Sequence, residues 1–323
     1  MTKKYKKFKK SLISIISIMF ILFVAFWGLK SYSASNNNLN FIQVSDVHLS
    51  SAKINKSYRL TAESGVLFED VINQINETPN INFVMFTGDM IDNPRQKELI
   101  RFISYANNIR YPWYAVLGNH DICVGGSLSK EMYWKILNSH NKNFNFTKTY
   151  YSFYPKKGFK VIGLDLVIDD RISVNGEIDE NQLKWLDKEL SKSKKDVVLI
   201  FLHYPLIEPF PSKTHKVLNA DKVLNVIHKY KNPIAIFTGH YHTTKIYQSG
   251  NILHVNTPAI ISYPNAFRLV KINNQKNKVI FDFYFKETRL KNLQKRAKML
   301  VFGAKTYYGT DKDRTTTYII DKK

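Results

Sequence analysis

The sequence predicts an α/β layered domain that follows a membrane-inserting N-terminal segment. From residue 39 onward, short apolar runs alternate with amphipathic stretches of helical period, which is the pattern of a layered α/β domain. The 323 residues are 44% hydrophobic with only 13 Gly and 10 Pro, enough apolar material for a sizeable core. A single cysteine excludes an intramolecular disulfide and a cysteine-built zinc site. Disordered, collagen-like and disulfide-stapled classes are therefore excluded.

The first forty residues have the charge pattern of a membrane anchor. Residues 1–10 contain six lysines, and residues 11–29 then run without a charge. In helical form this uncharged run would cover most of the ~30 Å hydrocarbon thickness of a bilayer. Basic flanks stay on the cytoplasmic side of a membrane. We therefore expect residues 1–10 in the cytoplasm and the chain after Lys30 outside the cell.

A cleaved signal peptide is the alternative to an anchor. Ser33-Ala34-Ser35 is an acceptable small-residue cleavage site. However, signal peptides usually have an apolar stretch of only ~7 to 15 residues. The longer run here, with the bulky Phe26-Trp27 pair near its end, favours an uncleaved anchor. We expect a single-pass protein of the cell membrane with an extracellular main domain, joined by a polar linker at residues 30–39, or else a secreted protein.

Six apolar runs are the first predicted strands, and five amphipathic stretches are the helices between them. The predicted strands are residues 40–44, 83–87, 113–117, 159–164, 197–202 and 234–237. The predicted helices are residues 60–75, 96–106, 130–137, 180–190 and 220–227. Asp179 with Gln182 three residues later is the expected N-cap of the fourth helix.

After His242 the pattern changes to strands without helices, which predicts hairpins. These strands are residues 245–248, 252–255, 267–272 and 279–285, so the main domain is expected to span residues 40–285. Residues 286–323 are expected to form a basic helix, over 286–301, and a tail. We expect this helix to pack against the domain, and its alternative is to lie on the membrane.

The charge balance predicts attraction to polyanions. Lys and Arg total 48 against 26 Asp and Glu, and without residues 1–34 the balance is still 41 − 26 = +15. A net charge of this size bears on the partners and the solubility of a protein, and it carries no information about the fold. Anionic wall polymers are the expected partners of an exported basic domain. The sequence contains no specific nucleic-acid-binding motif.

Side chains that bind metals directly follow five of the predicted strands. The five tips are Asp46-Val47-His48, Gly88-Asp89, Gly118-Asn119-His120-Asp121, His203 and Gly239-His240-Tyr241-His242. The carboxyl ends of parallel strands meet at one edge of a sheet, so these side chains are expected to converge. Five of the nine histidines lie at these tips. The other four, which are expected at the surface or in packing, are His140, His215, His228 and His254.

The spacing within two tips suits a metal centre. Side chains two residues apart in an extended chain point to the same side, which pairs Asp46 with His48 and His240 with His242. Imidazole, carboxylate and amide donors without thiolate suit Mn, Fe or Zn. Two such ions ~3.5 to 4 Å apart would contact both the attacking and the leaving oxygen of a phosphoryl group.

The five motifs resemble those of the calcineurin-like metallophosphoesterases. D-V-H, G-D-M-I-D-N, G-N-H-D, a lone His and G-H-Y-H occur in that family's order and spacing, over roughly residues 40–285. The resemblance implies a four-layer α-β-β-α sandwich of two mixed sheets with metals at the strand tips. It also implies a phosphoester substrate and two divalent ions, Mn, Fe or Zn, as cofactors.

The resemblance also implies a ligand set. One ion is expected on Asp46, His48, Asp89 and His242, and the other on Asp89, Asn119, His203 and His240, so that Asp89 bridges them. A bridging hydroxide would attack phosphorus while the catalytic His120 protonates the leaving oxygen. Asp121 would either hold the His120 ring or cap its loop.

Departures from the family's branches favour a phosphodiesterase. Purple acid phosphatases have a tyrosine where this chain has Asp92, and protein phosphatases have an arginine where it has Asn93. The motifs thus lack an arginine that would bind a dianionic monoester. Tyr204, Tyr241 and Tyr263 are expected to offer surfaces for an organic group on the second ester oxygen. The alternatives are a phosphomonoesterase of the same fold and a catalytically silent polyanion-binding surface protein.

Overall fold

The computed structural model describes residues 17–20, 23, 37–122, 124 and 126–322. The chain divides into two compact units, Met1–Asn38 and Leu39–Lys323. The predicted cytoplasmic segment and most of the predicted anchor lie outside the described residues. In the part of the chain that the structure describes, no helix has both the length and the apolarity needed to cross a membrane.

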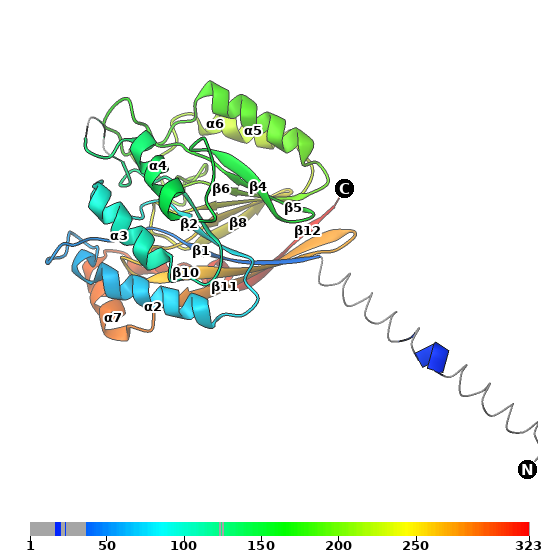
Figure 1. Cartoon of the computed structure of the whole chain (residues 1–323), viewed down its shortest axis with the longest axis horizontal. Helices are drawn as coiled ribbons and strands as arrows, with labels where there is room; N and C mark the ends of the chain where they lie inside the picture. The colour runs from blue at the N-terminus through cyan, green and yellow to red at the C-terminus, as the bar shows by residue number, and fades with distance from the viewer. Residues whose placement is uncertain (1–16, 21–22, 24–36, 123, 125, 323) are drawn as a thin grey trace, which may run out of the picture. The chain divides into compact units, whose positions relative to one another are not determined.

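The described residues of the larger unit form two mixed sheets of six strands each (Figure 1). The first sheet has the order β12-β11-β10-β1-β2-β3, with strands β1 (Asn38–Val44), β2 (Phe83–Thr87), β3 (Trp113–Val116), β10 (Ala266–Asn274), β11 (Lys278–Glu287) and β12 (Thr316–Asp321). The second has the order β4-β5-β6-β7-β9-β8, with strands β4 (Tyr151–Lys156), β5 (Phe159–Gly163), β6 (Val197–Phe201), β7 (Ile234–Thr238), β8 (Lys245–Ser249) and β9 (Ile252–Asn256). In the first sheet, neighbouring strands pair in parallel from β1 through β2 to β3. In the second, they pair in parallel from β5 through β6 and β7 to β9. Antiparallel pairing joins β10 to β11 and β11 to β12 in the first sheet, and β4 to β5 and β8 to β9 in the second.

Helices cover the outer faces of the two sheets. The helices of the larger unit are α2 (Ser64–Glu77), α3 (Gln96–Ala106), α4 (Lys130–His140), α5 (Glu180–Lys192), α6 (Ala220–Ile227), α7 (Lys291–Leu300), α8 (Ala304–Tyr308) and α9 (Asp311–Arg314). In Figure 1, α2 and α3 lie on one side of the molecule and α5 and α6 on the other.

Aromatic rings join the layers into one core. Between the sheets, the ring of Phe41 in β1 lies 5.5 Å from that of Phe201 in β6 and 5.1 Å from that of Phe237 in β7. On the outer face, Phe86 of β2 lies 5.1 Å from Phe102 of α3. The second sheet therefore packs on one face of the first sheet, and α3 packs on the other.

The predicted strands and helices of residues 40–285 are present in the structure, and Asp179 caps α5 by accepting hydrogen bonds from the backbone N–H groups of Asn181 and Gln182. Strand β4 was not predicted because its six residues contain Pro155 and pair irregularly with β5. Strand β12 was not predicted because it is the edge strand of its sheet and buries only Ile320 fully among its six residues.

The C-terminal residues belong to the same compact unit as the sheets. Helix α7 buries Ala297 in a small cluster with Leu60 and Ile261, as expected for a helix that packs against the domain. Beyond it, β12 pairs with β11 in the first sheet. The carbonyls of Thr306 and Tyr307 accept hydrogen bonds from the Thr243 and Thr244 hydroxyls, directly after the G-H-Y-H motif.

Candidate metal centre

The expected metal-binding side chains leave the strands on a strained backbone. Five of the seven expected ligands have a positive φ, between 43° and 67°: Asp46, His48, Asp89, His240 and His242. This region is costly for residues other than glycine, at about 1 to 3 kcal/mol each. Such strain persists only where the surrounding structure holds it, and it clusters at functional sites. The strained backbone at the tips of β1, β2 and β7 therefore sets the direction of these side chains.

Two glycines allow the tips to approach one another. A Cβ on Gly239 would lie 1.8 Å from Ser45 Oγ, and a Cβ on Gly88, whose φ is +85°, would lie 2.4 Å from His203 Nδ1. No side chain fits at either position without displacing a neighbour. The glycines bring the tips of the two sheets into direct contact.

Asp46, His48 and His242 form one group of potential ligands. Their donor atoms lie within 4.8 Å of one another, and all three side chains are buried. The His242 Nε2 atom is 3.3 Å from Asp46 Oδ1. These residues come from the tips of β1 and β7, so both sheets contribute to the group.

Asp89, His203 and His240 form a second buried group within the same 4.8 Å limit. Asp89 Oδ2 lies 3.4 Å from His203 Nε2 and also 3.4 Å from His48 Nε2 of the first group. One carboxylate oxygen thus faces both groups, which is the position required of a bridging ligand. Six of the seven expected ligand positions belong to these two groups, and the buried amide oxygen of the seventh, Asn119, has no hydrogen-bond partner among the described residues.

Several donor atoms at the centre have no hydrogen-bond partner among the described residues. They are Asp46 Oδ1, His48 Nε2, Asn119 Oδ1 and His240 Nε2, all of them buried atoms. An unpaired buried polar atom costs free energy, and natural proteins pair nearly all of them. All four belong to the expected ligand set, and N and O donors of this kind suit Mn, Fe or Zn. The residues present therefore fit two divalent cations.

The electrostatics keep three of the expected ligands, Asp89, His48 and His240, in the protonation state that binds a cation. Burial disfavours the charged form of Asp89, yet the surrounding histidines, His203 first, outweigh it and hold its pKa well below the usual value. Burial lowers the pKa of His48 to about 4, so its imidazole is neutral near neutrality. Burial also lowers the pKa of His240 well below the usual value. A carboxylate and two neutral imidazoles are thus available to a cation at neutral pH.

Outer partners orient the ligand rings. His203 Nδ1 lies 2.8 Å from the Thr87 carbonyl, and His242 Nδ1 lies 2.8 Å from Ser262 Oγ. These contacts hold each ring so that Nε2 faces the centre. Oriented ligands of this kind are a general feature of metal sites.

His120 stands at the edge of the centre. Its backbone N–H donates to Asp89 Oδ1 at 2.8 Å, and its Nδ1 lies 3.1 Å from the Asp92 carbonyl. A proton on Nδ1 would be donated to that carbonyl, and Nε2, on the other side of the ring, lies 3.2 Å from Arg59 Nη1. The ring is half-buried and therefore reachable by a ligand.

Asp121 braces the loop and does not contact the His120 ring. Its Oδ1 accepts from the backbone N–H groups of Met90 and Ile91, and its Oδ2 accepts from Gly118 N at 2.8 Å. Burial raises the pKa of Asp121 to about 8. These hydrogen bonds are those of a loop cap, one of the two roles expected for Asp121.

An arginine that the sequence motifs did not indicate lies at the centre. Arg59 Nη1 is 3.2 Å from His48 Nδ1, 3.2 Å from His120 Nε2 and 3.3 Å from Asp92 Oδ1. The motifs themselves lack an arginine, as stated above, but the site has one from outside them. Arg59 lies in the irregular loop after β1, where no motif or period marks it. Asp92 belongs to the G-D-M-I-D-N motif, but nothing in the sequence indicated its contact with His48.

The other expectations near the centre are partly corrected. His215 was expected in packing or at the surface, and its exposed ring lies 5.3 Å from that of His240. Tyr204 is fully buried, and Tyr241 and Tyr263 are nearly so, with Tyr263 stacked on Tyr308. None of the three tyrosines offers a free face to a ligand, contrary to the expectation.

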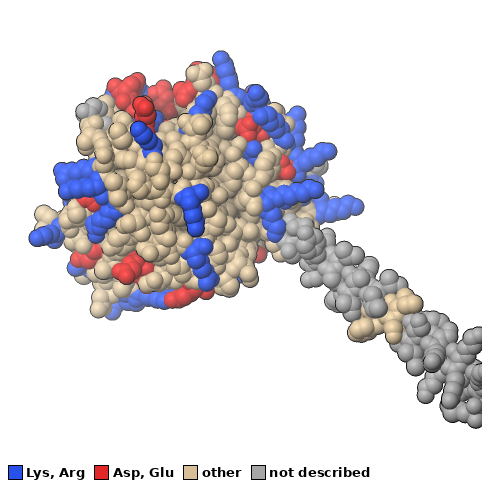
Figure 2. All heavy atoms as spheres, in the orientation of Figure 1, with Lys and Arg blue, Asp and Glu red and all other residues tan. Residues whose placement is uncertain are grey.

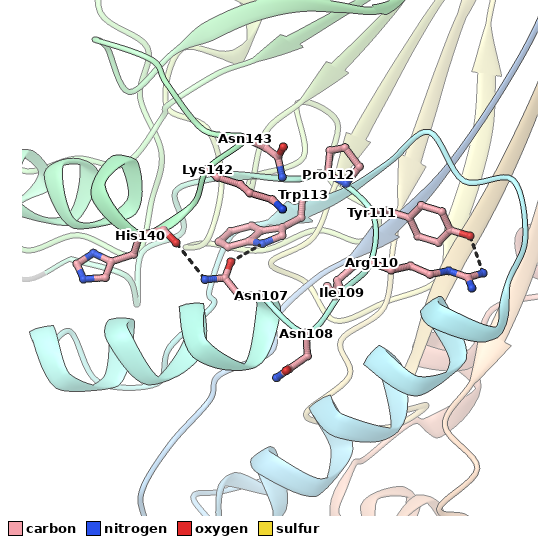
Figure 3. Close-up of a pocket in the computed structure, with 10 residues that line it drawn as sticks. All are labelled: Asn107, Asn108, Ile109, Arg110, Tyr111, Pro112, Trp113, His140, Lys142 and Asn143. Carbon is pink, nitrogen blue, oxygen red and sulfur yellow. Dashed lines mark hydrogen bonds between the residues drawn. The ribbon is translucent and has the colours of Figure 1, made fainter.

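A separate cavity lies away from the metal-binding side chains (Figure 3). It has a volume of about 590 Å³ and is lined by residues 107–113, His140, Lys142 and Asn143. Trp113 begins β3 there and donates from Nε1 to Asn107 Oδ1 at 3.2 Å. Because Asn119 follows the other end of β3, this cavity lies at the opposite end of the strand from the centre.

Comparison with known proteins gives a consistent family. Residues 39–244 match the model of the family described as calcineurin-like phosphoesterase. A probable glycerophosphodiester phosphodiesterase from Arcobacter nitrofigilis is 27% identical over 62% of this chain and 71% of its own length. A probable cyclic nucleotide phosphodiesterase from Colwellia psychrerythraea is 24% identical over 71% of this chain and 81% of its own. The crystal structure of a dimetal phosphatase from Danio rerio shares the fold, with a TM-score of 0.63 at 18% identity, over 77% of this chain and 99% of that one.

Proposed function

Because the chain belongs to the calcineurin-like phosphoesterase family, we propose that it hydrolyses a phosphodiester outside the cell at a centre of two divalent ions. Membership of the family makes it a hydrolase of phosphoester bonds with metal ions as cofactors. The observation that carries the proposal is the pair of buried ligand groups that share Asp89, with unpaired donor atoms on both sides.

The proposed ligands divide between two ions. Asp46, His48, Asp89 and His242 would hold one, and Asp89, Asn119, His203 and His240 the other. When bound, the ions would supply a bridging hydroxide as nucleophile and stabilise negative charge on the phosphoryl oxygens. The strained backbone and the glycine contacts fix these side chains before substrate arrives, so little reorganisation is needed.

His120 is the proposed general acid. Its Nδ1 contact with the Asp92 carbonyl fixes the ring and leaves Nε2 to transfer a proton to the leaving oxygen. In the free protein Arg59 Nη1 lies 3.2 Å from that nitrogen. A phosphoryl oxygen that enters between them would accept from the guanidinium, and His120 in its imidazolium form, with a proton on both ring nitrogens, would donate the Nε2 proton to the leaving oxygen and become neutral.

Two observations support a diester substrate. The relatives in two bacterial species carry the names of phosphodiesterases. Arg59 shares its guanidinium between His48, His120 and the Asp92 carboxylate. Its N–H donors are therefore not all free for a bidentate contact with a dianionic monoester. Glycerophosphodiesters, external nucleotides and wall teichoic polymers are the proposed substrate classes, and anionic wall polymers are the proposed partners.

The proposed location is the outer face of the cell membrane, with residues 11–29 as a single span or, alternatively, secretion after cleavage. The six lysines of residues 1–10 support this orientation. Protease treatment of intact cells tests it. The domain should be degraded while a cytoplasmic marker survives, and a domain protected together with that marker would refute the location. A mature N-terminus near Asn36 would identify the secreted form.

The reaction is tested by parallel rates with Mn on bis-para-nitrophenyl phosphate, para-nitrophenyl phosphate, cyclic AMP and purified teichoic acid. We expect diester rates above the monoester rate and about two equivalents of metal per chain. A monoester rate far above every diester rate would refute the diester assignment while leaving the metal centre intact. Protein that stays inactive with Mn, Fe or Zn would instead indicate a catalytically silent polyanion-binding protein.

A further inference from the structure

Six lysines surround a cavity of about 490 Å³ on the larger unit, far from the metal centre. We call them the lysine cluster: Lys194, Lys195, Lys229, Lys231, Lys276 and Lys322. The first four precede β6 and β7, Lys276 lies in the turn between β10 and β11, and Lys322 follows β12. Segments that are distant in sequence thus bring cationic side chains to one place.

The strand directions locate the lysine cluster at one end of the sandwich. Strands β1, β6 and β7 all run toward the metal centre, because Asp46, His203 and His240 follow their last residues. Their first residues therefore lie at the opposite end. Strand β1 begins at Asn38, so the chain enters the domain at the same end as the lysine cluster. Figure 2 shows Lys and Arg side chains projecting at this end, on the right of the view.

The loops that carry the cluster are braced, and their charges are largely uncompensated. The Asn232 amide donates to the carbonyls of Ser193 and Asp196, and the Asn251 amide donates to the carbonyls of Tyr230 and Asn232. Five of the six lysines are exposed, and Lys322 is half-buried. Among the described residues, Lys229 is the one member that forms an ion pair, at 3.3 Å from Asp187. The cluster is thus a fixed cationic surface.

We propose that the lysine cluster binds the anionic phospholipid surface of the membrane in which the chain's own N-terminal segment is anchored. The proposal rests on the membrane location given above. Residues 30–37 join the uncharged run to β1, and eight extended residues reach at most about 30 Å. The cluster is therefore kept within reach of the lipid headgroups. Lysines close to such a surface are attracted strongly, and the attraction falls off within a Debye length of ~8 Å.

This arrangement directs the metal centre away from the lipid. The seven residues of β1 alone separate the two ends by about 23 Å. The centre would then face substrates beyond the membrane surface, such as soluble diesters or wall polymers. Headgroups of the same leaflet would lie out of its reach.

A vesicle flotation experiment tests the proposal without the anchor. The fragment 38–323 retains both sheets and every core side chain of the larger unit, so it is expected to fold alone. It should float with phosphatidylglycerol vesicles at low salt, remain unbound with phosphatidylcholine vesicles, and dissociate at high salt. The variant K194Q/K195Q/K231Q/K276Q should lose at least tenfold in partitioning and keep its rate on bis-para-nitrophenyl phosphate.

The matched control removes the same charge at the other end. Lys53, Lys295, Lys298 and Lys305 are exposed and lie on the loop after β1 and on α7 and α8, near the metal-centre end. The variant K53Q/K295Q/K298Q/K305Q should float like the parent fragment. Equal loss in both variants would refute a specific face, and loss in the control alone would assign the membrane contact to α7. Binding of teichoic acid without vesicle binding would assign the cluster to wall polymers. Vesicle binding by catalytically inactive protein would refute the proposed reaction and leave this inference standing.

Discussion

The two ends of the sandwich are built on opposite principles. At the carboxyl end of the strands, charged and polar side chains are buried on strained backbone and some of their donor atoms have no partner within the described chain. At the amino end, lysines stand on braced loops with their charges in solvent. The first arrangement stores free energy that a ligand can recover, whereas the second offers long-range attraction at little cost in stability. Substitutions at the two ends should therefore have effects of different kinds.

The largest effect is expected from Asp89→Ala at the carboxyl end. Asp89 Oδ2 lies 3.4 Å from a histidine of each ligand group, so its removal weakens both ion sites together. We expect the rate on bis-para-nitrophenyl phosphate to fall at least ~10³-fold. Metal analysis should give fewer than two equivalents per chain.

Asp170→Ala is the control for this change, because Asp170 is an exposed carboxylate paired with Arg171. It should retain the parent's rate and metal content. Two tightly held ions in the Asp89→Ala protein would contradict the bridging position.

His120→Ala is expected to have the next largest effect. A general acid contributes roughly 10² to 10⁴-fold, so kcat should fall by about that factor while the metal content stays at two equivalents. The loss should be larger for an alkyl leaving group, which needs the proton, than for para-nitrophenol. His140→Ala, at the end of α4, should change neither quantity. An equal loss for both leaving groups would show that His120 does not deliver the proton.

Arg59→Met should have a smaller effect on the same centre. Losing one charged donor to a phosphoryl oxygen costs about 1.5 to 3 kcal/mol, which predicts a roughly 10- to 100-fold fall in kcat/KM. Arg95→Met, at an exposed arginine before α3, is the matched control. If kcat/KM were unchanged in Arg59→Met, its contacts with His48 and His120 would be structural and not part of substrate binding.

Features marked by a regular sequence pattern could be predicted from the sequence, whereas features that depend on irregular loops or on residues distant in sequence could not. The strand tips could be predicted because each ligand directly follows an apolar run, and parallel strands bring such ends together. Arg59 could not be predicted, since the loop after β1 has no period to place it beside His120. The role of Asp121 was left open for a similar reason, because its partners are backbone N–H groups of a different loop. The lysine cluster was visible only as net charge, since its members lie far apart in the sequence.

The smallest expected effect concerns a lysine at the amino end that is not exposed. Lys160, near the start of β5, is buried and lies 2.9 Å from Glu189 of α5. Burial opposes the charge of Glu189, but hydrogen bonds from Lys160 and then Ser152 lower its pKa from 4.5 to about 2. Because the folded-state pKa is depressed, the pair stabilises the fold above about pH 4.5, and this contribution is lost as the pH falls toward 2.

Glu189→Gln should therefore lower the free energy of unfolding at pH 7 by about 1 to 3 kcal/mol, because it leaves the Lys160 charge buried without its charged partner. Urea unfolding at several pH values measures this, and the variant should lose stability less steeply than the parent between pH 4.5 and 2. The double variant Lys160→Met/Glu189→Leu should recover most of the stability, since it removes both buried charges. Catalysis and vesicle binding should stay at the parent's values in both variants. A drop in either would mean that the buried pair at the amino end supports more than the packing of α5 on the second sheet, and that the two ends are not independent.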